Sequence, residues 1–223
     1  MNAQHLSNCS GGLSAIHDVR GVNARLNPSG FRKDIPMTLT TLDLNTALII
    51  VDLQKGIVSL PVVHPIGDII QRARVLADAF RTRGLPVVLV NVTGGAPGRT
   101  EQPRQTGPRP EGWTDLIPEL NQQPGDIVVT KQTWGAFTRT NLEAQLNGLG
   151  VTQVVIAGVA TGIGAEATAR QAFELGFNVT LAIDAMTDMS SEAHEYSIAN
   201  VFPRLGETGT TQNIIDLLTA RNP

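Results

Sequence analysis

The stretch Ala47-Leu48-Ile49-Ile50-Val51-Asp52-Leu53-Gln54 decides the fold of this 223-residue chain. Five consecutive apolar residues, most of them branched, predict a strand that is covered on both faces, as in a parallel sheet. A carboxylate follows at once, at Asp52. Because parallel sheets bind ligands beyond the carboxyl ends of their strands, Asp52 is a candidate functional residue.

Similar apolar runs recur along the chain and alternate with helical patterns. Strands are predicted at residues 47–53, 86–92, 126–130, 153–157 and 178–183. Apolar residues recur at helical spacing within 66–83, 140–149, 164–175 and 190–201. Glycines, which commonly end helices, follow three of these segments at Gly84, Gly150 and Gly176. The alternation predicts an α/β fold of three layers, α-β-α, with a mostly parallel central sheet.

Composition restricts the kind of protein and its partners. The chain has 41% hydrophobic and 17% charged residues and a formal net charge of -3, which indicates a globular protein and argues against nucleic-acid and membrane partners. Its apolar runs are too short to cross a bilayer. Cys9 is the single cysteine, so this chain alone builds no disulfide framework or thiolate metal site. We expect a cytoplasmic location.

Residues 1–36 differ in character from the rest of the chain. They carry scattered glycine and asparagine, show no sustained periodicity, and lack the apolar stretch of a secretory signal. We expect a flexible N-terminal extension at residues 1–36 and one folded domain at residues 37–223. A natural start at Met37 explains the same features equally well.

Two further strands end at groups that could take part in catalysis or bind a ligand. The third predicted strand ends at Lys131, and the fourth leads through the glycine-rich turn 158–164 into a helix whose first amides could bind an anion. Partial burial would raise the pKa of Asp52 and suit it to proton transfer. A helix cap, a solvated lysine and a tight turn explain each feature separately. Together they indicate a site at one edge of the sheet.

The order and spacing of these residues resemble the isochorismatase-like hydrolases, also called the cysteine hydrolase superfamily. The resemblance covers about residues 41–218. It rests on residues 47–54, on Lys131-Gln132-Thr133-Trp134-Gly135-Ala136-Phe137, and on Ala157-Gly158-Val159-Ala160-Thr161 followed by Ala167-Thr168-Ala169-Arg170. It implies a Rossmann-like fold, catalytic roles for Asp52 and Lys131, and no cofactor. It also implies a cis peptide bond at Val159-Ala160, a last short strand near residues 202–208, and a homo-oligomer.

The nucleophilic cysteine of that family falls on Gly164 in this chain. Glycine has no side chain to attack with, so covalent thioester chemistry is excluded at this site. The resemblance therefore points to the branch with glycine here, the isochorismatases, which hydrolyse a vinyl ether. In that reaction Asp52 would protonate the enol ether, water would add, and pyruvate and an alcohol would leave.

Two alternatives stay open, because Val159-Ala160-Thr161 resembles the cysteine amidases instead. One is hydrolysis of an amide or another C–N bond by water activated at Asp52, with amides near Gly164 stabilising the oxyanion. The other is a protein that binds a ligand and does not turn it over.

The expected substrate is a small anionic or cyclic metabolite. Its binding is assigned to Gln54, Trp134, Phe137, Thr161, Gly162 and Ile163, with the long loop at residues 93–118 shaping the pocket. Core packing explains the two aromatic side chains equally well. Arg99, Arg104 and Arg109 are either carboxylate-binding or solvated loop residues. The chain lacks the paired histidines of the nicotinamidase metal site, so no metal is expected.

Overall fold

Strand β1 (Thr46–Val51) lies at the centre of a six-stranded sheet of order β3-β2-β1-β4-β5-β6. The computed structural model describes residues 39–102 and 107–220, so the extension predicted at residues 1–36 lies outside the described residues. All neighbouring strands pair in parallel, which sharpens the expected mostly parallel sheet to a wholly parallel one. The other strands are β2 (Val87–Val92), β3 (Ile127–Lys131), β4 (Gln153–Val159), β5 (Asn178–Thr187) and β6 (Glu207–Gly209).

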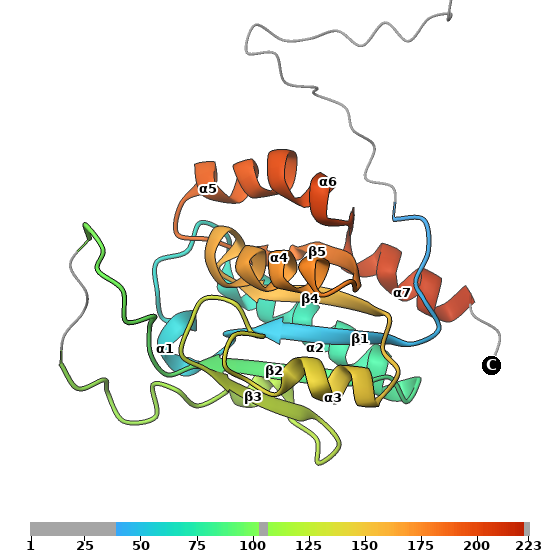
Figure 1. Cartoon of the computed structure of the whole chain (residues 1–223), viewed down its shortest axis with the longest axis horizontal. Coiled ribbons are helices and arrows are strands. Elements are labelled where there is room, and N and C mark those ends of the chain that lie inside the picture. Colours follow the sequence, from blue (N-terminus) through green and yellow to red (C-terminus); the bar gives the residue numbers. More distant parts are fainter. Residues whose placement is uncertain (1–38, 103–106, 221–223) are drawn as a thin grey trace, which may run out of the picture. The chain divides into compact units, whose positions relative to one another are not determined.

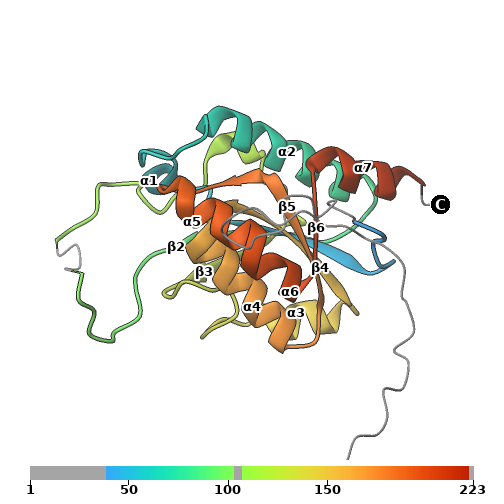
Figure 2. The same ribbon diagram turned by 90° about the horizontal axis from the view of Figure 1, so that it is seen from above.

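Helices cover both faces of this sheet, as Figures 1 and 2 show. The three-layer α-β-α fold that the sequence predicts is confirmed. One face packs against α2 (Ile66–Thr82) and α7 (Thr211–Ala220), and the other against α3 (Leu142–Gly148), α4 (Glu166–Glu174) and α6 (Phe202–Leu205). The two remaining α-helices are short, α1 (Lys55–Val58) and α5 (Ser191–Tyr196). Among the helices of the described residues, none is long and apolar enough to cross a membrane.

The quoted stretch forms the middle of the core because its side chains alternate between two layers. Ala47, Ile49 and Val51 pack in the layer of α3 and α4, whereas Leu48 and Ile50 pack in the layer of α2 and α7. Every residue of β1 is buried. A strand with helices on both sides needs apolar residues at each position, which explains the uninterrupted run.

Three helices end just before the predicted glycines, but two segments predicted as continuous helices contain a π-helical turn. Gly84, Gly150 and Gly176 have φ of 65°, 68° and 88°, the left-handed conformation that ends a helix. The segment expected to be helical from residue 164 begins with a π-helical turn, Thr161–Ala165, and becomes α-helical at Glu166. Residues 190–201 are divided in the same way, by a π-helical turn at Ser197–Val201.

The end of the chain departs further from the sequence prediction. The last strand, expected near residues 202–208, is confined to β6 at Glu207–Gly209, because Phe202–Leu205 is helical. The sequence patterns do not predict helix α7, of which Thr211, Ile214 and Leu218 are buried. The cis peptide bond at Val159-Ala160 is confirmed.

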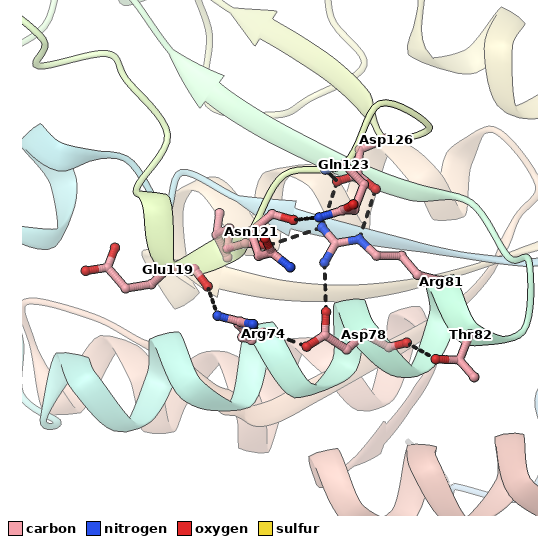
Figure 3. Close-up of polar contacts among 9 residues, drawn as sticks. Arg74, Asp78, Arg81, Thr82, Glu119, Asn121, Gln123 and Asp126 are labelled. Carbon is pink, nitrogen blue, oxygen red and sulfur yellow. Dashed lines mark hydrogen bonds and ion pairs between the residues drawn. The ribbon is translucent and has the colours of Figure 1, made fainter.

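A partly buried ion pair connects α2 to the amino end of β3, at the sheet edge opposite to the carboxyl ends of the strands. Arg81 Nη2 lies 2.7 Å from Asp126 Oδ2, and Arg81 Nε donates to Asp126 Oδ1 at 3.1 Å. The guanidinium also donates to Asp78 Oδ1 and the carbonyl of Leu120, and Asp126 Oδ2 accepts a bond from the backbone N–H of Gln123 (Figure 3). Both carboxylate oxygens and all three guanidinium nitrogens are therefore bonded within the protein.

Candidate active site

The candidate site lies where the strand order reverses. From β1 the chain continues to β2 on one side, and later places β4 on the other side. Loops therefore diverge at the carboxyl end of β1, the position at which open parallel sheets bind ligands. Asp52 directly follows β1, Lys131 ends β3 and Val159 ends β4, and all three line one cavity of about 300 Å³. The prediction that these strand exits share one edge of the sheet is confirmed.

The floor of this cavity is an ion pair between Asp52 and Lys131. Lys131 Nζ lies 2.7 Å from Asp52 Oδ2, although the two residues are 79 positions apart in the sequence. The ammonium also donates to the carbonyls of Trp134 at 2.8 Å and Thr133 at 3.3 Å. Three acceptors for three ammonium protons hold Lys131 in one orientation. Both residues are almost fully buried, with 5% exposure for Asp52 and 2% for Lys131.

Burial controls the protonation of Asp52. Desolvation raises its pKa from 3.8 to about 6, outweighing the charge and the hydrogen bond of Lys131, which lower it. Its second oxygen, Oδ1, is buried and has no hydrogen-bond partner among the described residues. A carboxyl group with a pKa near 6 and an unused oxygen suits proton transfer near neutral pH. Its backbone is also unusual, with φ of 53° at a residue other than glycine.

Gly164 brings a helix start against this carboxylate. A Cβ atom at this position would lie 3.0 Å from Val51 Cγ1 and 3.2 Å from both Asp52 Oδ2 and the Val159 carbonyl. Those distances are tight for a side chain, so glycine allows the backbone to approach the ion pair. The only cysteine of the chain, Cys9, lies outside the described residues.

The polar groups of the turn before Gly164 are bonded inward, within the protein. Thr161 is fully buried, and its hydroxyl lies 2.8 Å from His194 Nδ1. The N–H of Gly162 donates to Asp188 Oδ2 at 2.7 Å. Neither residue lines the cavity, and the substrate-binding roles assigned to them stay predictions. The N–H groups of Ile163 and Ala165 donate to the carbonyl of Ala160, so these amides are not free to hold an oxyanion as expected.

Gln54 and Phe137 also lie away from the cavity. The Gln54 amide accepts from the N–H of Val92 and donates to the carbonyls of Val92 and Trp113, so it ties the long loop to the end of β1. Phe137 packs in the core against Phe177, with ring centroids 5.9 Å apart. Buried neighbours contact both side chains, and the predicted contacts of Gln54 and Phe137 with substrate stay predictions.

The cavity walls combine predicted and unpredicted residues. Trp134 and Ile163 line it as the sequence analysis expected, and Trp134 is 65% exposed. The long loop contributes Arg109 and Trp113, whereas Arg104 lies outside the described residues. Met189, after β5, completes the rim. Sequence analysis missed Trp113 and Met189 because neither follows a motif or a periodic pattern.

Within residues 39–102 and 107–220, no group of three His, Cys, Asp or Glu side chains is placed to hold a metal ion. Asn91, near the carboxyl end of β2, instead donates from Nδ2 to the carbonyl of Thr114 at 2.8 Å. The polar groups in this part of the site therefore organise the loop.

Comparisons with known proteins agree with this architecture. The Isochorismatase domain model matches residues 46–213. The chain belongs to the isochorismatase family of hydrolases. It is 39% identical over 188 residues to YwoC, an uncharacterised isochorismatase family protein of Bacillus subtilis, covering 80% of this chain and 98% of that one.

Two further relatives place the chain within that family. The solved structure of an isochorismatase family protein from Burkholderia thailandensis superposes with a TM-score of 0.78 at 38% identity, covering 81% of this chain and 98% of the other. Ureidoacrylate amidohydrolase RutB of Variovorax paradoxus is 30% identical over 212 residues, covering 81% of this chain and 83% of its own. The family thus includes relatives of named and of uncharacterised activity.

Proposed function

We propose that this isochorismatase family hydrolase cleaves a vinyl ether without a cysteine nucleophile, releasing pyruvate, with Asp52 as the proton donor. The observation that carries the proposal is the carboxyl group of Asp52, which is buried, has a pKa raised to about 6, and keeps one oxygen unpartnered among the described residues. Gly164 presents no side chain beside that carboxyl that could form a covalent intermediate.

The reaction needs one proton and one water molecule. Protonated Asp52 transfers its proton to the terminal carbon of the enol ether, whose π electrons form the new C–H bond and leave an oxocarbenium ion. Water adds to this cation and returns a proton to Asp52. The hemiketal then transfers its hydroxyl proton to the ether oxygen, the bond to that oxygen breaks, and pyruvate and an alcohol leave. Asp52 ends protonated, as it began.

Lys131 acts in this scheme as a fixed positive charge. Its three protons are directed at Asp52 Oδ2 and two backbone carbonyls, so it positions the carboxyl group. It also stabilises the carboxylate that forms once Asp52 has given up its proton. The proton donor is Asp52 because its pKa is close to neutral pH.

Hydrolysis of a C–N bond is the second candidate, favoured by the similarity to a protein named as an amidohydrolase. Here the Asp52 carboxylate would take a proton from water, and the hydroxide would attack the amide carbon. The C–N bond of the tetrahedral intermediate would then break as Asp52 returns the proton to the leaving nitrogen, giving a carboxylic acid and ammonia or an amine. The two candidates require opposite protonation states of the same residue. Activity that depends on the acid falls as the pH rises through about 6, whereas activity that depends on the base rises there.

The test is to supply isochorismate and, separately, a panel of small amides to the purified protein. Pyruvate is followed with lactate dehydrogenase and NADH, and ammonia with glutamate dehydrogenase. We expect pyruvate, a rate that falls above about pH 6, and no loss of activity after treatment with iodoacetamide. Ammonia without pyruvate would establish the second candidate, ligand binding without either product would indicate a non-catalytic protein, and inactivation by iodoacetamide would refute a cysteine-independent mechanism.

A further inference from the structure

Among the described residues, three charged side chains line the active-site cavity. Two of them, Asp52 and Lys131, form the buried pair at its floor. The third is Arg109, which is exposed and comes from the long loop. Within the part of the chain that the structure describes, Arg109 forms no ion pair with a carboxylate. Whether Asp52 is ionised or protonated, the cavity therefore has a positive charge nearer to solvent, on Arg109, that no carboxylate of the described residues pairs with.

Arg109 is held on an aromatic platform. Its Cζ atom lies 3.6 Å from the centroid of the Trp113 ring, so the guanidinium stacks on the indole. Stacking restricts the long arginine side chain while leaving the N–H groups in the plane of the guanidinium free to bind a ligand. Two parallel N–H groups match the two oxygens of a carboxylate.

Hydrogen bonds hold Trp113 against the residues that follow β1. The carbonyl of Trp113 accepts bonds from the N–H of Gly56 at 2.9 Å and from Gln54 Nε2 at 3.2 Å. Gly56 packs directly against the indole, and a Cβ atom at this position would collide with it. Lys55 N also donates to the carbonyl of Asp115. This part of the loop thus has a defined position relative to Asp52, which follows the same strand.

We infer that Arg109, stacked on Trp113, is the residue that selects a carboxylate at the rim of the active site. The ligand class is a small carboxylic acid with a flat, unsaturated or aromatic body, since Trp113, Trp134 and Ile163 are walls of a cavity of only about 300 Å³. The inference rests on the proposed function in one respect, which is that the bound acid is also the molecule that Asp52 hydrolyses.

Binding can be measured without turnover. The chain has two tryptophans, and both, Trp113 and Trp134, line the cavity. Their fluorescence therefore reports a ligand that enters it. Benzoate and benzamide make a matched pair of probes, because they share a flat ring and a similar size and differ in charge. Titrations use the full chain and its Asp52→Asn variant, in which binding is separated from catalysis.

We expect the unsubstituted protein to bind benzoate about tenfold or more tightly than benzamide, as a hydrogen bond to a charged group allows. Arg109→Gln should abolish this preference, and Arg109→Lys should restore part of it. Arg99→Gln is the matched control, since Arg99 lies exposed in the same loop and does not line the cavity. Circular dichroism spectra identical to those of the unsubstituted protein establish that the variants are folded.

The outcomes separate this inference from the proposed function. A preference for benzoate that survives Arg109→Gln, or no preference at all, overturns the inference even if pyruvate is released. Loss of the preference in Arg109→Gln, with no pyruvate from isochorismate, supports the carboxylate site and refutes the proposed reaction. If both proposals hold, Arg109→Gln raises KM for isochorismate about tenfold or more and leaves kcat nearly unchanged, because binding changes and the acid does not.

Discussion

Two ion pairs at opposite edges of the same sheet have the same shortest N–O distance and different chemistry. Lys131 lies 2.7 Å from Asp52 at the carboxyl edge, and Arg81 lies 2.7 Å from Asp126 at the amino edge. The Asp126 carboxylate is bound on both oxygens, whereas Asp52 Oδ1 has no partner among the described residues. A short N–O distance in an ion pair is therefore by itself no sign of a catalytic site.

The difference extends to the electrostatics of the two pairs. At Arg81, burial lowers the pKa. The hydrogen bond and charge of Asp126, and then those of Asp78, raise the pKa by more than burial lowers it, so Arg81 stays positively charged. At Asp52, burial outweighs the help from Lys131, and the pKa rises to about 6. Complete bonding stabilises the charged state of one pair, and incomplete bonding leaves the other ready to exchange a proton.

The largest effect is expected for activity at the carboxyl edge. Asp52→Asn removes the transferable proton and should lower kcat by about 10³-fold, the contribution typical of a positioned acid. Asp126→Asn is the matched substitution at the other edge and should leave kcat within about twofold, since it lies outside the active-site cavity. Steady-state kinetics at a temperature where both variants are folded makes the comparison. Equal losses in the two variants would contradict it.

At the amino edge, substitutions should change stability rather than activity. Arg81→Met leaves Asp126, whose side chain is only 3% exposed, without its cation, and should lower the free energy of unfolding by about 3 kcal/mol. Lys55→Met breaks the exposed pair with Asp115, where both side chains are about half exposed, and should change it by less than about 1 kcal/mol. Denaturant unfolding measures both. A loss below 1 kcal/mol for Arg81→Met would show that this pair does not anchor β3.

The raised pKa of Asp52 makes stability depend on pH. The folded protein binds this proton more tightly than the unfolded chain, so Asp52 favours folding below about pH 4, and this contribution disappears as the pH rises through about 6. The unfolding free energy of the protein minus that of Asp52→Asn should therefore fall between pH 4 and 7, by on the order of 3 kcal/mol. A difference that stays constant or rises over this range would contradict the raised pKa.

A smaller effect is expected where glycine approaches the catalytic pair. Gly164→Ala places a Cβ atom 3.2 Å from Asp52 Oδ2 and should lower both kcat, by a few-fold, and stability, by about 1 kcal/mol. Gly148→Ala in helix α3 is the control, because its Cβ atom would meet nothing within 4 Å. It should raise stability by about 0.5 kcal/mol without changing kcat. Equal behaviour of the two variants would show that Gly164 is not sterically required.

Sequence patterns predicted the parts of the site that backbone topology controls. Asp52 and Lys131 follow apolar runs, and parallel strands carry such residues to one edge of the sheet, so their meeting could be foreseen. Thr161 and Gly162 were predicted on the same reasoning and are directed inward by His194 and Asp188, which lie in the sequence after β5. Side-chain direction within a turn depends on such distant partners, and no local pattern records them.

The amino-acid order alone determined the alternation of strands and helices, the buried central strand, the acidic residue at its exit and the absence of a thiol at Gly164. These are local properties, since they follow from apolar periodicity and from which side chain occupies a position. Only the tertiary structure decided that one oxygen of Asp52 has no partner among the described residues, that Gln54 and Phe137 turn away from the cavity, and that Trp113 and Arg109 complete its wall. Burial and bonding there depend on segments far apart in the chain, because side chains compete for space and partners only once the sheet has formed. The homo-oligomer that the family resemblance implies stays a prediction.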